Sequence, residues 1–149
     1  MMLALRRILL TAVLLAGCST PFQGMKFRAQ APPIEEAFRK LSLAVTVDGY
    51  EIDQIMPSSF KIETKWRDAK EQEVFKGEKA VPESRTECKV SIRLEARGKM
   101  YDVLFTPALR RTSHDGKVTE EIVGWGHPLT EKWDGVFKRI LDREQREED

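Results

Sequence analysis

Few side chains in this sequence have the types and spacing that acid–base or metal chemistry requires. Its two histidines, His114 and His127, fall on a predicted turn and at a predicted strand end, with no metal-ligand spacing around either. Ser113-His114-Asp115 holds the residue types of a hydrolase triad, but adjacent residues cannot take the poses of a triad, which is assembled in space. We therefore expect surface histidines, no enzymatic activity, no metal and no cofactor.

Two pairs of adjacent carboxylates have structural explanations that do not need catalysis. Glu35 and Glu36 would lie at the positive end of a helix dipole, and Glu120 and Glu121 would face arginines on a neighbouring strand. The sequence also has no glycine-rich loop of the kind that binds phosphates. These residues therefore give no reason to expect an enzyme.

The one cysteine with an expected chemistry is Cys18, which directly follows Leu15-Ala16-Gly17. This tetrapeptide resembles the lipobox of bacterial lipoproteins. The resemblance implies that a diacylglycerol is attached to the Cys18 thiol and that the chain is cleaved after Gly17. Only cysteine suits the position, because its thiolate forms the thioether bond.

Residues 1–17 have the organisation of a lipoprotein signal peptide. Arg6 and Arg7 give a positively charged n-region. The apolar stretch at 8–16 that follows suits an h-region and is too short to cross a bilayer, which needs about 20 residues. Ser19 rather than an aspartate follows the cysteine, and in proteins with similar signals this implies transfer to the outer membrane. We therefore expect a lipid anchor in the outer membrane and a domain that faces the periplasm.

Composition indicates one domain without affinity for nucleic acid. Removing 17 of the 149 residues leaves 132, which suits a single domain. The 25 basic residues lose Arg6 and Arg7 with the signal peptide, so 23 face 24 acidic ones and no basic field remains. Because Cys18 carries lipid, Cys88 has no disulfide partner, and its place on the apolar side of an alternating run predicts a buried, inert thiol.

The mature chain divides into a tether and a domain. Residues 18–33 are expected to be the lipidated N-terminus and a flexible tether, because they contain Pro21, Gly24 and Pro32 and show no helical or strand period. About 15 residues reach at most roughly 50 Å, so the domain could stand away from the bilayer. Residues 34–146 are expected to form a single α+β domain.

Apolar residues at spacings of three and four predict two helices. The first spans Pro33–Val47, with Pro33 in its first turn. The second follows Thr130, which suits an N-cap. Its apolar stripe consists of Trp133, Val136, Phe137, Ile140 and Leu141.

Alternation of apolar and polar residues predicts five strands between the helices. The first two are Tyr50–Ile55 and Phe60–Trp66. The polar segment Asp68–Glu87 then separates the second strand from the third, and we expect a mobile loop there. A connection this long is unusual inside a compact domain, which points to a functional role.

The third and fourth strands form a hairpin around Gly98, because apolar residues alternate on both sides of it. A turn on Gly98-Lys99 sets Glu95 opposite Asp102. A turn one residue earlier shifts the register by two and sets Arg93 opposite Asp102 instead. Both choices keep the apolar faces together, so the sequence leaves the register open.

A second hairpin is predicted by Asp115-Gly116, a strong signal for a two-residue turn. A fold at this turn extends the fifth strand from about Lys117 to Trp125. Three residue pairs support one register, namely Leu109 with Ile122, Arg110 with Glu121 and Arg111 with Glu120.

The order helix, five strands, helix predicts an α+β two-layer sandwich. Its five-stranded antiparallel sheet would carry the N- and C-terminal helices packed on one face, as in helix-grip domains. Most large aromatic residues then fall on inward faces and are expected in the core: Trp66, Tyr101, Phe105, Trp133 and Phe137.

One segment resembles a known family. The run from Tyr50 to Arg67, with Lys61-Ile62-Glu63-Thr64-Lys65-Trp66 after a helix and a Gly-Tyr pair, resembles a segment of the BamC lipoproteins of the β-barrel assembly machinery. That family consists of outer-membrane lipoproteins with helix-grip domains, two where this chain has one. The resemblance implies a related fold and carries over no functional residues.

These observations favour a membrane-anchored periplasmic lipoprotein that acts as a non-catalytic adaptor or accessory component of an envelope protein complex. The alternative is a periplasmic binding or carrier domain for a small apolar ligand or lipid. Trp125 is the candidate for the partner surface, because the parity set by Ile122 turns it outward. The Asp68–Glu87 loop is expected to contribute to the same surface.

Overall fold

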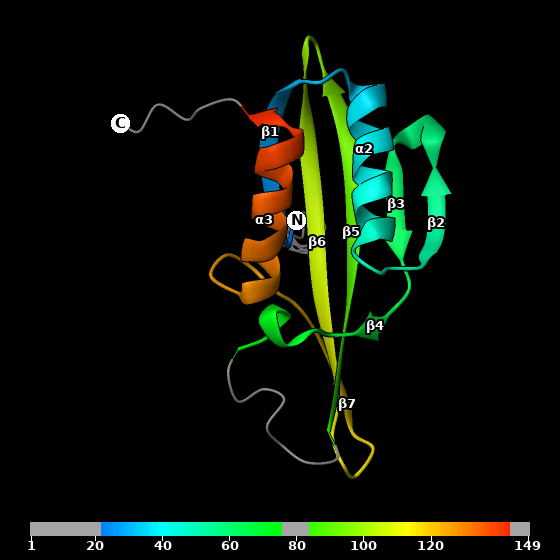
Figure 1. The fold of residues 1–149 in the computed structure, drawn as a ribbon, viewed down its shortest axis with the longest axis vertical. Coiled ribbons are helices and arrows are strands. Elements are labelled where there is room, and N and C mark those ends of the chain that lie inside the picture. The colour runs from blue at the N-terminus through cyan, green and yellow to red at the C-terminus, as the bar shows by residue number, and fades with distance from the viewer. Residues whose placement is uncertain (1–21, 76–83, 144–149) are drawn as a thin grey trace, which may run out of the picture.

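The computed structural model describes residues 22–75 and 84–143, and the expected signal peptide and Cys18 lie outside these ranges. In the described part, two helices lie against one antiparallel sheet of eight strands (Figure 1). The helices are α2 (Ile34–Val47) and α3 (Pro128–Ile140). The strands are β1 (Met25–Ala31), β2 (Ile52–Met56), β3 (Lys61–Thr64), β4 (Arg67–Asp68), β5 (Arg85–Arg97), β6 (Met100–Thr112), β7 (Val118–Ile122) and β8 (Asp142–Arg143), with short 3-10 turns η1 (Pro57–Ser59) and η2 (Glu71–Glu73).

A long hairpin of β5 and β6 forms the centre of the sheet, and each of its strands has 13 residues. Along β5, β3 and β4 pair with successive parts of the strand, and β1 and β7 do the same along β6. The strand order is β2-β3-β5-β6-β1-β8. The end of the hairpin that carries β7 extends beyond the two helices (Figure 1).

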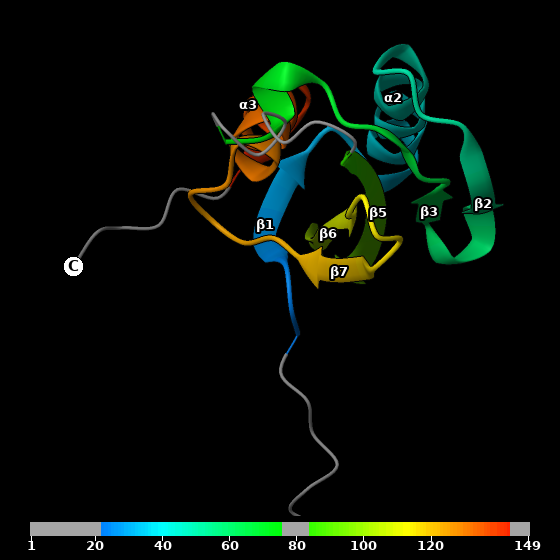
Figure 2. The same cartoon turned by 90° about the horizontal axis from the view of Figure 1, so that it is seen from below.

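The predicted five-stranded, helix-grip-like class is wrong, because the described residues form eight strands. β1, β4 and β8 were not expected. β4 and β8 have two residues each, which is too short to show a period in the sequence. Both helices nevertheless cover the same face of the sheet and leave the other face open (Figure 2).

β1 lies in the segment that the sequence predicted to be a flexible tether. It pairs antiparallel with β6, with Met25 opposite Phe105. Met25 and Ala29 are buried, and the ring of Phe27 lies 5.2 Å from that of Phe137. The folded domain therefore begins near residue 25 rather than 34, which shortens the chain between it and the expected lipid anchor.

Gly24 brings the chain onto the sheet. Its φ is +130°, and a Cβ atom at this position would lie 2.4 Å from the carbonyl oxygen of Phe105 and 3.3 Å from the ring of Phe22. A side chain here would collide with backbone in the middle of β6. Only glycine lets the chain enter the sheet this closely.

The central hairpin adopts the register with the turn on Gly98-Lys99, so Glu95 stands opposite Asp102. Arg97 and Arg28 donate hydrogen bonds to the two carboxylate oxygens of Asp102 over 2.9 and 3.3 Å. Burial alone would raise the pKa of Asp102, but these bonds outweigh burial and lower it. The two arginines thereby offset the repulsion between the facing carboxylates.

The predicted register of β7 is wrong by one residue, because Leu109 faces Glu121 and Ile122 faces Ala108. Val123 explains the difference. Its backbone N–H donates to the carbonyl of Pro107 over 3.0 Å, and its side chain is buried. The apolar residue that enters the core is therefore Val123, and Ile122 stays 43% exposed.

Aromatic side chains fill the layer between the sheet and the helices. The ring centroid of Phe105 lies 5.7 Å from that of Trp133 and 5.1 Å from that of Phe137. These three residues and Tyr101 are buried, which confirms four of the five aromatic residues predicted for the core. Trp66 is the exception and belongs to the opposite face.

Candidate functional site

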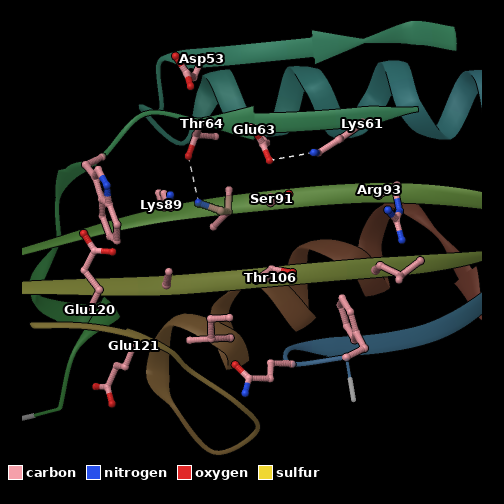
Figure 3. A pocket seen from close by; sticks show the side chains of 17 residues that line it. Asp53, Lys61, Glu63, Thr64, Lys89, Ser91, Arg93, Thr106, Glu120 and Glu121 are labelled. Atoms are coloured by element: carbon pink, nitrogen blue, oxygen red, sulfur yellow. Dashed lines mark hydrogen bonds and ion pairs between the residues drawn. The ribbon is translucent and has the colours of Figure 1, made fainter. Parts of the chain in front are cut away.

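A groove of about 900 Å³ lies on the open face, which is the face of the sheet opposite the helices. Figure 3 shows its labelled side chains along β2, β3, β5, β6 and β7. The open face arises because successive residues of a strand point to opposite sides, so that Ser91 and Thr106 face away from the helices. The groove is lined by Phe22, Gln23, Asp53, Lys61, Glu63, Thr64, Trp66, Lys89, Val90, Ser91, Arg93, Leu104, Thr106, Ala108, Glu120, Glu121 and Ile122.

Trp66 is the largest side chain in this groove. The ammonium of Lys89 lies 4.8 Å and the guanidinium of Arg110 lies 4.6 Å from the centre of its indole. Arg110 is held in turn by hydrogen bonds to Glu87 over 3.0 and 3.1 Å. Trp66 was expected in the core, but β3 ends at Thr64, so the alternation does not continue to residue 66.

The groove presents charges of both signs over small residues. Lys61 and Glu63 form an ion pair of 3.0 Å on one side, and the carboxylates of Glu120 and Glu121 come from β7 on the other side (Figure 3). The groove therefore suits contact with a surface that also contains both polar and apolar groups.

A second feature is a buried ionic network around Arg67 and Glu73. The guanidinium of Arg67 donates to Glu73 over 2.7 and 2.6 Å and to Asp48 over 2.9 Å. Lys132 of α3 contacts the same two carboxylates at 2.9 and 2.8 Å, and Lys70 lies 3.5 Å from Asp48. The network therefore connects β4, η2, the end of α2 and α3.

Glu73 is fully buried and stays ionised because of these partners. Burial would raise the pKa of Glu73, but hydrogen bonds from Arg67 and Lys132 outweigh burial and lower it to about 2. The network also explains part of the Asp68–Glu87 segment. Its described start is fixed to the fold through β4 and η2 rather than being a mobile loop.

Cys88 borders this network and is buried, as the sequence predicted. Its sulfur lies 3.3 Å from the hydroxyl of Tyr50 and 3.3 Å from a guanidinium nitrogen of Arg67. Burial raises the pKa of the Cys88 thiol and of the Tyr50 hydroxyl. Both groups are thus neutral at physiological pH, and neither is a poised nucleophile.

A third feature, which we call the aromatic patch, consists of Phe75 and Trp125. Trp125 is 59% and Phe75 is 51% exposed. The ring of Phe75 lies 5.0 Å from that of His127, which is two residues from Trp125. The two segments that the sequence singled out therefore come into contact at the N-terminus of α3.

The histidines differ from each other. His114 is exposed on the turn between β6 and β7, as expected. His127 is only 7% exposed, which corrects its assignment to the surface. Its Nδ1 accepts a hydrogen bond from the backbone N–H of Leu129 over 3.1 Å and caps α3, the role that the sequence gave to Thr130.

Of the predicted site residues, Cys18 lies outside the described residues and Trp125 is placed on the surface. The ionic network had no signal in the sequence, because Asp48 and Lys132 lie far along the chain from Arg67 and Glu73. Among the described residues, no group of histidine, cysteine and carboxylate side chains could hold a metal ion. No helix in this part of the chain is long and apolar enough to cross a membrane.

No protein-family model and no curated protein matches this chain. The resemblance to BamC therefore remains a hypothesis from the sequence, and the groove, the network and the aromatic patch are the features that bear on function.

Proposed function

We propose that this protein is an outer-membrane lipoprotein, anchored through lipid on Cys18, whose periplasmic domain is a non-catalytic adaptor or accessory component of an envelope protein complex. The aromatic patch carries this proposal. Tryptophan and other aromatic residues are enriched among the residues that dominate binding energy at protein interfaces. Trp125 and Phe75 are each more than half exposed, in two segments that are joined by the ring contact between Phe75 and His127.

The ionic network supports a recognition role for the patch. It fixes η2, the turn that precedes Phe75, by burying Glu73 between Arg67 and Lys132. A fixed aromatic side chain loses less conformational entropy on binding than one on a free loop. We therefore assign the buried charges of the network a structural role, which is to hold η2 in place beside Phe75.

The carrier alternative has less support. It would need apolar space between the helices and the sheet, where Phe105, Trp133 and Phe137 are all fully buried and pack ring against ring. The groove that does exist lies on the other face and is lined by many charged residues. An apolar ligand would remove water from these charges without offering them polar contacts.

Palmitate labelling in cells tests the anchor. The Cys18→Ala variant should lose the label and accumulate as precursor, because the lipobox loses its only thiol. The Cys88→Ala variant is the matched control and should be labelled like the unaltered protein. Equal labelling of Cys18→Ala would contradict the proposed anchor.

Crosslinking in cells tests the partner surface. Trp125→Ala and Phe75→Ala should each reduce the yield of crosslinked complexes, while Leu43→Ala, which removes a 60% exposed side chain from α2, should not. All three variants should keep the thermal midpoint of the unaltered protein. Equal yields from Trp125→Ala and Leu43→Ala would contradict the assignment of the patch.

A further inference from the structure

We propose that the short lipid anchor holds the open face of the sheet against the phospholipid surface of the membrane. The inference rests on the proposed lipidation of Cys18 and deepens it, because it assigns an occupant to the groove on the open face. Three features support it, namely the reach of the chain, the point where the chain leaves the sheet and the chemistry of the face.

The reach of the anchor is limited by β1. Phe22 is the first described residue and lines the groove. It follows Cys18 by four residues, and four residues span at most about 14 Å even when fully extended. Phe22, at one edge of the groove, must therefore stay within that distance of the lipid-bearing cysteine.

The chain leaves the sheet near its middle rather than at a corner. Met25 pairs with Phe105, which lies five residues from Met100 and seven from Thr112. At about 3.4 Å per residue, the ends of the hairpin are roughly 17 and 24 Å away. The seven residues from Cys18 to Met25 span at most about 24 Å, so standing on either end would stretch this chain nearly or fully, whereas the open face needs no such extension. The helices lie on the far side of the sheet (Figure 2).

The open face combines exposed apolar side chains with charged side chains of both signs, among them the carboxylates of Glu120 and Glu121, and so suits the mixed apolar and charged headgroup layer. It exposes apolar side chains that nothing in the described structure covers, with Phe22 46% and Ile122 43% exposed. The cationic groups of Lys89 and Arg110 both contact the indole of Trp66. Tryptophan and long basic side chains are favoured at the level of lipid headgroups, where one end is apolar and the other is hydrated.

This orientation leaves the aromatic patch accessible. Phe75 contacts the ring of His127, which caps α3 in the helical layer. With the open face on the bilayer, the helical layer faces the periplasm. The open face of the sheet would then contact the membrane, and the aromatic patch beside the helices would bind the partner.

Spin labels on the full lipidated protein in vesicles test the proposal. Each of three variants carries one nitroxide on an introduced cysteine: Ser91→Cys in the groove, Leu43→Cys on α2 or Arg139→Cys on α3. The unaltered protein, in which Cys88 is buried, gives the background labelling. The vesicles contain phosphatidylethanolamine with a minor fraction of phosphatidylglycerol. We expect collisions with a water-soluble nickel complex to be several-fold less frequent at position 91 than at either helical position.

A lengthened anchor is the matched control. A Gly-Ser linker of about 20 residues inserted before Phe22 adds an r.m.s. span of roughly 25 Å and should abolish the protection at position 91. Equal accessibility at all three positions in the protein of natural length would overturn the inference, and so would protection that persists with the long linker. Palmitate labelling of the same samples separates this failure from a failure of the lipid anchor itself.

Discussion

Arg67 donates two hydrogen bonds to the carboxylate of Glu73, over 2.7 Å from Nη1 to Oε1 and 2.6 Å from Nη2 to Oε2. The pair joins β4 to η2, and Lys132 of α3 donates to the same carboxylate over 2.9 Å. One buried side chain thus links the segment after β4 to both layers of the fold.

The Glu73→Ala variant should be strongly destabilised. It leaves the guanidinium of Arg67 and the ammonium of Lys132 without their fully buried partner, and breaking a buried ion pair from one side costs about 3–5 kcal/mol. Urea unfolding measures the loss. Glu71→Ala, in the same turn but exposed, is the control and should change little. A loss below about 1 kcal/mol for Glu73→Ala would contradict the assigned role.

The same carboxylate predicts a loss of stability in acid. The pKa of Glu73 is lowered from 4.5 to about 2, so between these values the unfolded chain binds more protons than the folded one. Its contribution is fully present above pH 4.5 and is lost as the pH falls toward 2. Urea unfolding at several pH values should therefore show a shallower acid slope for Glu73→Gln than for the unaltered protein. Parallel slopes would show that Glu73 is not the titrating group.

Removing β1 should destabilise the domain, although the sequence alone assigned it to a tether. A chain that starts at Phe22 should unfold cooperatively. A chain that starts at Ile34 loses the buried Met25 and Ala29, and deleting one buried methionine side chain alone costs about 2–5 kcal/mol. Thermal unfolding of the two chains compares them. Equal midpoints would mean that β1 contributes no stability.

Leu94→Ala should cost about 2–5 kcal/mol, because the side chain is 2% exposed in the middle of β5 and its removal leaves a cavity. Leu43→Ala removes the same atoms from an exposed site of α2 and should cost far less. Chemical unfolding of both variants measures the difference. Similar costs for the two would show that the inward face of β5 has been misassigned.

The sequence predicted the helices and the central hairpin well, because their signals are long. α2 and α3 bury the expected stripes, and the alternation around Gly98 continues through both arms of the hairpin. β1 was missed for a physical reason. Its seven residues stand between Gly24 and Pro32, which together favour an irregular segment, and two of its inward positions are alanines, which give a weak apolar signal.

The missing strand also explains why the hairpin register stayed open. Arg28 of β1 donates to Asp102, and without β1 the facing Glu95 and Asp102 look like an uncompensated repulsion.

Trp125 is exposed as expected, but not through the parity of Ile122, because Ile122 is itself exposed and Val123 is buried. β7 ends at Ile122, so the alternation does not reach Trp125. The contact of the neighbouring His127 with Phe75 depends on η2. η2 is placed by Glu73 and Lys132, which are 59 residues apart, and single-sequence patterns do not report such contacts.

Gly24 and Met25 are also where tension between the membrane and a bound partner would enter the fold. The hydrogen bonds of an antiparallel pair run across the strands, so a pull perpendicular to the open face loads them one after another, beginning with Met25 and Phe105. β1 would peel from β6 as a zipper opens, at a lower force than sliding the strands apart would require. Under mechanical load, β1 would therefore detach from β6 and lengthen the chain between the domain and the lipid anchor before the central hairpin broke.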